Sequence, residues 1–432
     1  MITGAPVKRS SAKSSLREGF TTGSAAAAAA AGAVTLLLEG KLPSHAHVAL
    51  PPFIQDARGI TPASEASLTI PLAGGETFAA GLARAEVVKD GGDDPDATHG
   101  MVIQAYVSLR PIVASTLPES ALSRSAGLND HPPQPLKIAS ALNCPPCTIF
   151  LYSGKGIGAV TLPGLPIPPG EPAINPEPRK QIARAACDAA VRSGYCGEIH
   201  ILVCAEEGEE RAKRTLNARL GIMGGISILG TRGIVRPYSH EAWQEAILQS
   251  LNVATALGLE ELLLCTGRRS ERLGFGLYPG LPPQAGIQAA DFAAFTLREA
   301  ATRPFTRLRW ICFPGKLLKL AQGLEWTHAK AADADISMLA KLCREAGGGK
   351  ALAQEVQNMP TATGALALIR ERDSGLHWKV LETLGGMAYG SLQAWLEEAQ
   401  SGWTARNTLS LHVFAIEDEE LLLSLQGLPS DK

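Results

Sequence analysis

The sequence has no excess of charge of either sign and few aromatic residues. Its 432 residues include 40 Lys and Arg against 42 Asp and Glu, and only 5% are Phe, Trp or Tyr. Nonspecific binding to nucleic acid depends on excess positive charge, so this balance excludes a general phosphate-backbone binder. A small anionic ligand remains possible where basic side chains are grouped locally. The hydrophobic share, 45%, is carried by aliphatic residues, which predicts an aliphatic α/β core.

A convincing membrane span is also lacking. The one long apolar run, residues 25–38, follows basic residues as in a signal peptide. It is mostly Ala, and at about 15 residues it is shorter than the roughly 20 needed to cross a bilayer. Thr22 and Ser24 can cap a helix there and Gly40 can end it, so we expect a buried helix and no membrane contact. Eight scattered cysteines, several in apolar runs, indicate buried thiols and a cytoplasmic protein.

Complete nucleotide and metal motifs are missing as well. Gly40-Lys41 and Gly315-Lys316 are each followed by Leu rather than Ser or Thr, so neither forms a phosphate-binding P-loop. Cys144-Pro-Pro-Cys147 is a single C-x-x-C pair with no second pair to complete a zinc site. We therefore predict no protein metal site, and leave open whether the two thiols form a redox pair.

The pattern of elements changes near residue 238. Residues 1–15, rich in Ser and Lys, predict a disordered leader. Residues 16–238 predict an α+β domain with Gly- and Pro-rich ligand loops. In residues 239–432 strands alternate with helices, which implies parallel crossovers and a Rossmann-like α/β domain with a doubly wound, mostly parallel sheet. The expected helices are 181–193 in the first domain and 240–257, 284–301, 316–322 and 380–399 in the second, whose expected strands are 261–265, 307–313 and 408–415.

The densest polar segment is KDGGDDPD, residues 89–96, followed by His99. Four carboxylates within seven positions repel one another unless a cation, hydrogen-bond donors or a proton relieves them. Such repulsion would raise a carboxylate pKa towards neutrality, so Asp90, Asp93 and His99 are candidates for an acid or base. The alternative is a solvated turn, which Asp-Gly and Asp-Pro also favour.

Glycine-rich turns follow several predicted strands. The turn with Gly154, Gly156 and Gly158 has the G-x-G-x-G spacing, but the prolines after it prevent the helix that a dinucleotide fingerprint requires, so we expect a ligand-facing or structural turn. Residues 224–233 bring backbone N–H groups and a guanidinium together, which suits a carboxylate or phosphate but also suits a tight strand-end turn. Residues 265–269 repeat the theme at the end of a predicted parallel strand, where α/β sheets bind ligands.

Taken together, these segments resemble the cobalt-precorrin-5B C(1)-methyltransferase family. The resemblance is carried in order by LREGFTTGSAAAA at 16–28, the acidic segment 87–100, GLPIPPGEPAINP at 164–176, GISILGTRGIV at 225–235, and GKLLKLAQG at 315–323 with Thr327 and His328. Ser24-Ala25 stands where the family usually has Thr-Cys, so a catalytic thiol is not expected there.

The resemblance implies an S-adenosylmethionine-dependent enzyme that methylates carbon 1 of cobalt-precorrin-5B to give cobalt-precorrin-6A in cobalamin biosynthesis. Cobalt would belong to the tetrapyrrole substrate. A homo-oligomer and transient contact with neighbouring pathway enzymes are possible. The alternatives are a carrier for an anionic tetrapyrrole and a nicotinamide-dependent reductase. Besides the acid or base candidates, we expect substrate binding by Lys89, Arg179, Arg232, Arg236, Arg268, Arg269, Lys316 and His328, and cofactor binding by Gly154, Gly156, Gly158, Gly225, Thr231, Gly233, Thr266 and Gly267.

Overall fold

A computed structural model describes residues 16–432 except 57–58, 80, 123–137, 329–333, 400–402, 404–406 and 428–432. The predicted leader 1–15 lies outside the described residues. The chain forms two compact units, the first comprising residues up to 162 and 166–239, the second residues 163–165 and 240–432. Both units are mixed α/β structures, and several of their sheets contain antiparallel pairs.

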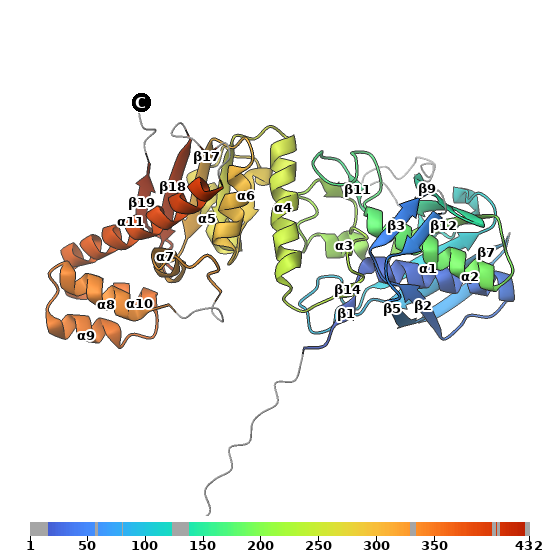
Figure 1. The fold of residues 1–432 in the computed structure, drawn as a ribbon, viewed down its shortest axis with the longest axis horizontal. Coiled ribbons are helices and arrows are strands. Elements are labelled where there is room, and N and C mark those ends of the chain that lie inside the picture. Colours follow the sequence, from blue (N-terminus) through green and yellow to red (C-terminus); the bar gives the residue numbers. More distant parts are fainter. Residues whose placement is uncertain are drawn as a thin grey trace, which may run out of the picture. The chain divides into compact units, whose positions relative to one another are not determined.

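The N-terminal unit is built on a six-stranded sheet of order β6-β7-β8-β12-β10-β9, in which only β10 and β12 run parallel. Helices α1 and α2 lie side by side and pack into one core with the sheet (Figure 1). The bounds of this unit's elements are β1 Gly19–Phe20, α1 Thr22–Glu39, β2 His45–Ala49, β3 Phe53–Asp56, β4 Gly59–Pro62, β5 Ser67–Pro71, β6 Gly74–Phe78, β7 Leu82–Val88, β8 Val102–Ser108, β9 Ile138–Cys144, β10 Cys147–Ser153, β11 Ala159–Val160, α2 Pro176–Arg192, β12 Glu198–Ala205, α3 Gly208–Ala212, β13 Ile222–Met223 and β14 Ile234–Val235, with short 3-10 turns at Ala114–Thr116 and Glu119–Ala121.

The Ala-rich run forms α1, as predicted, and it is the central helix of the N-terminal unit. Thr21, rather than the predicted Thr22 or Ser24, caps it through a hydrogen bond from the Ser24 backbone N–H, and Gly40 ends it with φ +73° as predicted. By length and composition α1 could cross a membrane, but 78% of its apolar window is buried inside the protein. Small Ala side chains let it approach the sheet and α2 closely, which explains a long helix with so little bulk.

Helix α2 begins five residues earlier than predicted, at Pro176. Prolines at positions 176 and 178 do not prevent it, because the first turn of a helix needs no backbone N–H donor. The first turns of the helix carry Arg179, Lys180 and Gln181.

The C-terminal unit contains a five-stranded sheet of order β16-β15-β17-β18-β19. The first four strands are parallel and β19 is antiparallel to β18. Leu263 and Ile311 face α5 on one side of the sheet, and Leu264 and Trp310 join the large core formed with α6, α7 and α11 on the other. The bounds are α4 His240–Ala256, β15 Glu261–Cys265, α5 Arg268–Leu277, a 3-10 turn Pro283–Ala285, β16 Gly286–Gln288, α6 Ala293–Ala301, β17 Arg307–Cys312, α7 Pro314–Ala321, α8 Ile336–Glu345, α9 Lys350–Gln357, α10 Ala362–Arg372, α11 Ser374–Glu398, β18 Thr408–Phe414 and β19 Leu421–Gln426.

The predicted helix 284–301 is wrong in its first half. A short strand, β16, occupies Gly286–Gln288, and helix α6 begins only at Ala293. The buried residues there alternate, with Ala285, Ile287 and Ala289 each fully buried. This period of two is the pattern of a strand, and in so short a run it is hard to distinguish from a helix.

Candidate functional site

Segments far apart in the sequence meet at the N-terminus of α1. The Thr22 hydroxyl lies within hydrogen-bonding distance of the carbonyl oxygens of Ser227 and Leu229, and accepts from the Leu229 backbone N–H at 2.9 Å. The Ser24 hydroxyl donates to the carbonyl oxygen of Gly233 at 2.7 Å. Strand β1, just before α1, pairs with β14, which directly follows Gly233. The sequence motifs at 16–28 and 225–235 therefore form one local structure.

The acidic segment binds the chain immediately before α1. The Arg17 guanidinium forms an ion pair with the Asp90 carboxylate, and the Arg17 backbone N–H donates to Asp93 Oδ2 at 2.7 Å. The two backbones approach so closely that a Cβ on Gly19 or Gly92 would overlap the opposite segment. The acidic segment 87–100 is therefore bound to segment 16–28, and the carboxylates of Asp90 and Asp93 both contact Arg17.

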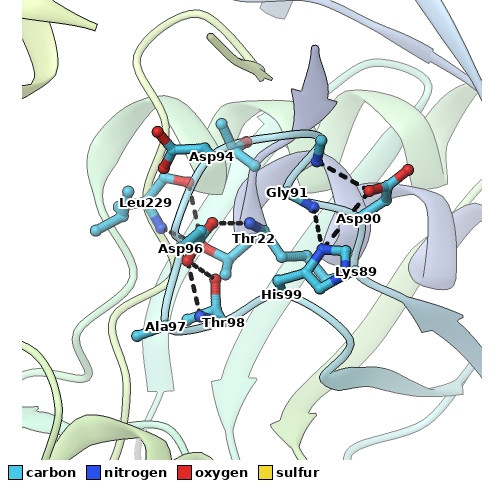
Figure 2. Close-up of polar contacts among 12 residues, drawn as sticks. Thr22, Lys89, Asp90, Gly91, Asp94, Asp96, Ala97, Thr98, His99 and Leu229 are labelled. Carbon is cyan, nitrogen blue, oxygen red and sulfur yellow. Dashed lines mark hydrogen bonds and ion pairs between the residues drawn. The ribbon is translucent and has the colours of Figure 1, made fainter. Parts of the chain in front are cut away.

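The buried Lys89 side chain offsets part of the negative charge of the acidic segment. The Lys89 side chain is 1% exposed, and its ammonium forms an ion pair with Asp96 (Figure 2). Burial alone would raise the pKa of Asp96, but the Lys89 charge and hydrogen bonds from Thr98 outweigh burial, and the pKa is lowered. The hydrogen bond from Arg17 likewise lowers the pKa of Asp90. The expected rise in pKa through mutual repulsion is therefore wrong for Asp90. The burial of the Lys89 side chain argues against Lys89 as a substrate ligand.

His99 accepts a backbone hydrogen bond at one ring nitrogen. The backbone N–H of Gly91 donates to His99 Nδ1 at 3.0 Å (Figure 2). An amide N–H can only donate, so in the neutral ring Nδ1 is the acceptor and Nε2 carries the proton. The side chain is 53% exposed. In that neutral form, His99 can donate a hydrogen bond through Nε2 to a ligand.

Asp94 holds an exposed aromatic residue. Its Oδ1 accepts from the backbone N–H of Tyr238 at 2.9 Å. Tyr238 has φ +57°, a left-handed conformation that costs energy in a residue other than glycine. Tyr238 is nevertheless 66% exposed, the highest value among the large hydrophobic residues that the structure describes. The protein thus maintains a strained backbone that presents an aromatic ring beside the acidic segment.

The turn with Gly154, Gly156 and Gly158 is closed by the protein's own backbone. A Cβ on Gly156 would overlap the carbonyl oxygen of Ala205, and one on Gly225 would overlap Gly156. A Cβ on Gly158 would lie 2.9 Å from the carbonyl oxygen of Gly225. As predicted, no helix follows the turn, and the short strand β11 does instead. These glycines permit close packing of three segments, which argues against their predicted contact with a cofactor.

The turn at residues 230–233 combines a packed glycine with exposed polar side chains. Gly233 has φ +75°, and a Cβ there would lie 2.5 Å from the Leu50 side chain, so its role is structural. Thr231 and Arg232 beside it are exposed. The glycine is therefore packed within the protein, whereas the two side chains beside it lie at the surface.

Two other arginines of this unit differ in exposure. Arg236 donates to Glu18 at 3.0 Å and remains 54% exposed. Arg179 is 14% exposed, pairs with Glu171 at 2.9 Å and donates from Nε to the Ile174 carbonyl oxygen. The Arg179 charge is therefore committed within the fold, which argues against its predicted role in binding substrate.

The C-terminal unit holds a second cluster of predicted residues at the ends of its parallel strands. Thr266 and Gly267 follow β15, and Gly315 lies in the first turn of α7, after β17. A Cβ on either glycine would meet no atom within 4 Å, so space is open beside both. The chain leaves β15 for β16 on one side and returns to β17 on the other, so strand order reverses here. Open α/β sheets bind ligands at such a point.

The basic residues at these strand ends are largely paired. Arg269 forms an ion pair with Glu419 at 2.8 Å and lies over the Phe313 ring. Lys316 forms an ion pair with Asp291 and donates to the Thr327 carbonyl oxygen. The other predicted residues are an exposed Arg268, at the start of α5, and His328, whose ring stacks on Trp326 with centroids 5.3 Å apart.

The C-x-x-C pair joins a third thiol. Cys144 and Cys147 face each other across the β9–β10 turn, and the Cys187 thiol on α2 donates to the Cys144 carbonyl oxygen. The side-chain interaction with Cys187 lowers the pKa of the Cys144 thiol. Within the described ranges, no group of three or more His, Cys, Asp or Glu side chains is placed to hold a metal ion.

Three residues were missed in the sequence. Arg17 stands in the first motif, but nothing local indicates that its partner is Asp90. Asp94 was counted as one of several carboxylates, and its contact with Tyr238 depends on tertiary structure. Asp291 was hidden because residues 284–301 read as one helix. An acidic residue soon after a short alternating run is the signal that would have shown a strand end there.

Comparison with known proteins identifies the family. A family model described as CbiD matches residues 9–237, and one described as CbiD, C-terminal domain, matches residues 326–404. This chain belongs to the CbiD family. A cobalt-precorrin-5B C(1)-methyltransferase from Nitratidesulfovibrio vulgaris is 46% identical over 357 residues, which are 83% of this chain and 82% of the relative. A protein of the same name from Geobacillus sp. (strain WCH70) is 38% identical over 85% of this chain and 88% of its own length.

One solved structure is similar to this CbiD chain. It is a crystal structure of cobalamin biosynthesis protein (cbiD) from Archaeoglobus fulgidus, 24% identical, covering 71% of this chain and 79% of that one with a TM-score of 0.32.

Proposed function

We propose that this CbiD-family protein transfers a methyl group from S-adenosylmethionine to carbon 1 of cobalt-precorrin-5B, giving cobalt-precorrin-6A in cobalamin biosynthesis. The observation that carries the proposal is the similarity to relatives of that name over more than four fifths of the chain. Cobalt is part of the substrate. The protein is proposed to have two domains, 16–238 and 239–432, of which the second is a doubly wound α/β domain.

The cofactor site is proposed to lie at the strand ends of the C-terminal unit. Among the predicted glycines, those of the N-terminal unit pack against protein, whereas Gly267 has open space beside it. Thr266 and Gly267 follow β15 at the position where strand order reverses. A glycine that leaves room for a ligand's adenosyl group fits this place, and the residues here are therefore suited to hold S-adenosylmethionine, which supplies the methyl group.

The substrate is proposed to bind the surface beside the acidic segment. The tetrapyrrole carries several carboxylates, which Arg232 and Arg236 can pair with, and the His99 Nε2–H can donate to another. Tyr238 offers an aromatic ring to the macrocycle. In this proposal Asp90, Asp94 and Asp96 keep the surface in shape and do not act as bases, and Asp93 and His99 remain the groups to test for proton transfer.

Positioning accounts for most of the proposed catalysis. As the new carbon–carbon bond forms, the methyl carbon–sulfur bond breaks and its electron pair stays on sulfur, so no protein nucleophile is required. Holding two bound reactants at near-attack distance can contribute roughly 7–11 kcal/mol. The residues of this chain therefore have to orient the substrate and exclude water.

The test is incubation of the purified chain with methyl-labelled S-adenosylmethionine and cobalt-precorrin-5B, followed by mass spectrometry of the tetrapyrrole. A labelled methyl group on the product is expected. Tetrapyrrole binding with no shift of the melting temperature by S-adenosylmethionine or S-adenosylhomocysteine would instead support the carrier alternative. NADPH-dependent reduction would support a reductase. A homo-oligomer, contacts with pathway enzymes and a cytoplasmic location remain predictions.

A further inference from the structure

Asp291 lies beside the proposed cofactor site, just after β16, the strand next to β15. The Cys265 end of β15 is in register with the Gln288 end of β16, and the Ala289 backbone N–H donates to the Cys265 carbonyl oxygen at 2.8 Å. Asp291 therefore follows the end of β16 on the same edge of the sheet as Gly267. The intervening Ala290 has φ +48°, a strained conformation that turns the chain just before this carboxylate.

The Asp291 carboxylate is held through one oxygen only. Lys316 and the Thr327 hydroxyl both donate to Oδ1, and the Thr327 backbone N–H donates to the Asp291 carbonyl oxygen at 2.9 Å. In the part of the chain that the structure describes, no hydrogen bond ends on Oδ2. The Asp291 side chain is 21% exposed. The carboxylate is thus fixed in orientation and retains an oxygen that can accept from a ligand.

The Lys316–Asp291 ion pair lies at the end of the sheet, next to the proposed cofactor site. Asp291 follows β16 and Lys316 follows β17, and β15 lies between these two strands. The ion pair therefore connects the loop after β16 with the first turn of α7, on either side of the β15 end, where Gly267 has open space. The pair thus borders the point where strand order reverses.

We propose that Asp291 accepts hydrogen bonds from the ribose hydroxyls of S-adenosylmethionine, and that Lys316 is the positioning residue that holds its carboxylate. The inference rests on the proposed function and deepens it. In dinucleotide-binding sheets the acidic residue that contacts the ribose follows the glycine turn by about 20 residues, and Asp291 follows Gly267 by about 24. Lys316 is thereby reassigned from the predicted binding of substrate carboxylates.

The experiment is isothermal titration of the full chain with S-adenosylhomocysteine and with its 2′-deoxy and 3′-deoxy analogues. The wild type is expected to bind at least one deoxy analogue roughly 10- to 100-fold more weakly, the usual effect of losing a hydrogen bond to a charged group. Asp291→Ala is expected to bind all three ligands with nearly equal affinity. Lys316→Met should reduce the discrimination, and Lys316→Arg should restore part of it. Glu382→Ala, on the exposed side of α11, is the matched control and should behave as wild type.

The outcomes separate the two proposals. If wild type binds S-adenosylhomocysteine but does not discriminate between the analogues, Asp291 has no role in ribose recognition and the cofactor proposal stands. If wild type does not bind S-adenosylhomocysteine at all, both proposals fail. Because the analogue series on wild type needs no substitution, poor folding of Asp291→Ala would not remove the test.

Discussion

The buried Lys89 ammonium forms an ion pair with Asp96, the last carboxylate of the acidic segment. This pair explains how four acidic residues can occupy seven positions without a metal ion or a shared proton. Asp90 has Arg17 as its cation, and Asp93 and Asp94 accept backbone N–H groups. The acidic segment is therefore a framework that fixes the neighbouring chain segments and the exposed Tyr238.

Removal of the Asp96 charge should strongly destabilise the protein. Asp96→Asn leaves the ammonium of the 1% exposed Lys89 side chain without its counterion, and breaking one partner of a buried pair typically costs about 3–5 kcal/mol. Urea unfolding followed by circular dichroism measures this. The control is Glu210→Gln, which breaks the exposed Lys213–Glu210 pair and should not measurably change stability. Equal effects of the two substitutions would contradict the assigned role of Asp96.

The same pair predicts a pH dependence of stability. The pKa of Asp96 is lower in the folded protein than in the unfolded chain, so its contribution is complete above the unfolded value of roughly 4 and is lost as the pH falls through the folded value. The urea midpoint of the wild type should therefore fall between pH 5 and pH 3 more steeply than that of Asp96→Asn. Parallel curves for the two proteins would show that Asp96 does not contribute this term.

Two glycine substitutions should have opposite effects on stability and binding. Gly225→Ala places a methyl group against the backbone of Gly156 and should cost about 1–3 kcal/mol or more in unfolding free energy. Gly267→Ala meets no atom within 4 Å and should leave stability nearly unchanged, but weaken binding of S-adenosylhomocysteine. Thermal melting and isothermal titration of both variants give the comparison. A stable Gly225→Ala protein that has lost cofactor binding would reverse our assignment of the two turns.

Tyr238 should affect recognition of the tetrapyrrole and little else. Tyr238→Ala removes an exposed ring whose stacking is worth about 0.5–1.5 kcal/mol, so KM for the macrocycle should rise up to roughly 10-fold, with KM for S-adenosylmethionine unchanged. Tyr238→Phe keeps the ring and should retain wild-type KM. Steady-state kinetics on both substrates decides this, and an unchanged macrocycle KM in Tyr238→Ala would remove the ring from the substrate surface.

The sequence predicted elements better than it predicted the roles of side chains. Helix α1 and strand β15 follow from long or strongly apolar runs, whose burial decides their structure. Strand β16 was missed because three alternating apolar residues cannot be distinguished locally from one face of a helix. Its order next to β15, which brings Asp291 towards Gly267, depends on a crossover that no local pattern specifies.

For the candidate site, the motifs were found but their partners were not. Lys89 and Arg179 were read as ligands because basic residues beside glycine turns suit carboxylates. Tertiary structure instead gives each an internal acidic partner, Asp96 and Glu171 respectively. Likewise, the glycines at 154, 156 and 158 have the spacing of a ligand turn, but the space beside them is filled by distant parts of the chain. Gly156 packs against the Ala205 backbone, and Gly158 packs against the Gly225 backbone.

A crystal structure with S-adenosylhomocysteine tests the central claim most directly, because the claim is that the C-terminal strand ends hold the cofactor. The account predicts ligand density beside Gly267, with the ribose hydroxyls within hydrogen-bonding distance of the Asp291 carboxylate. Density against the turn of Gly154, Gly156 and Gly158 instead would contradict it.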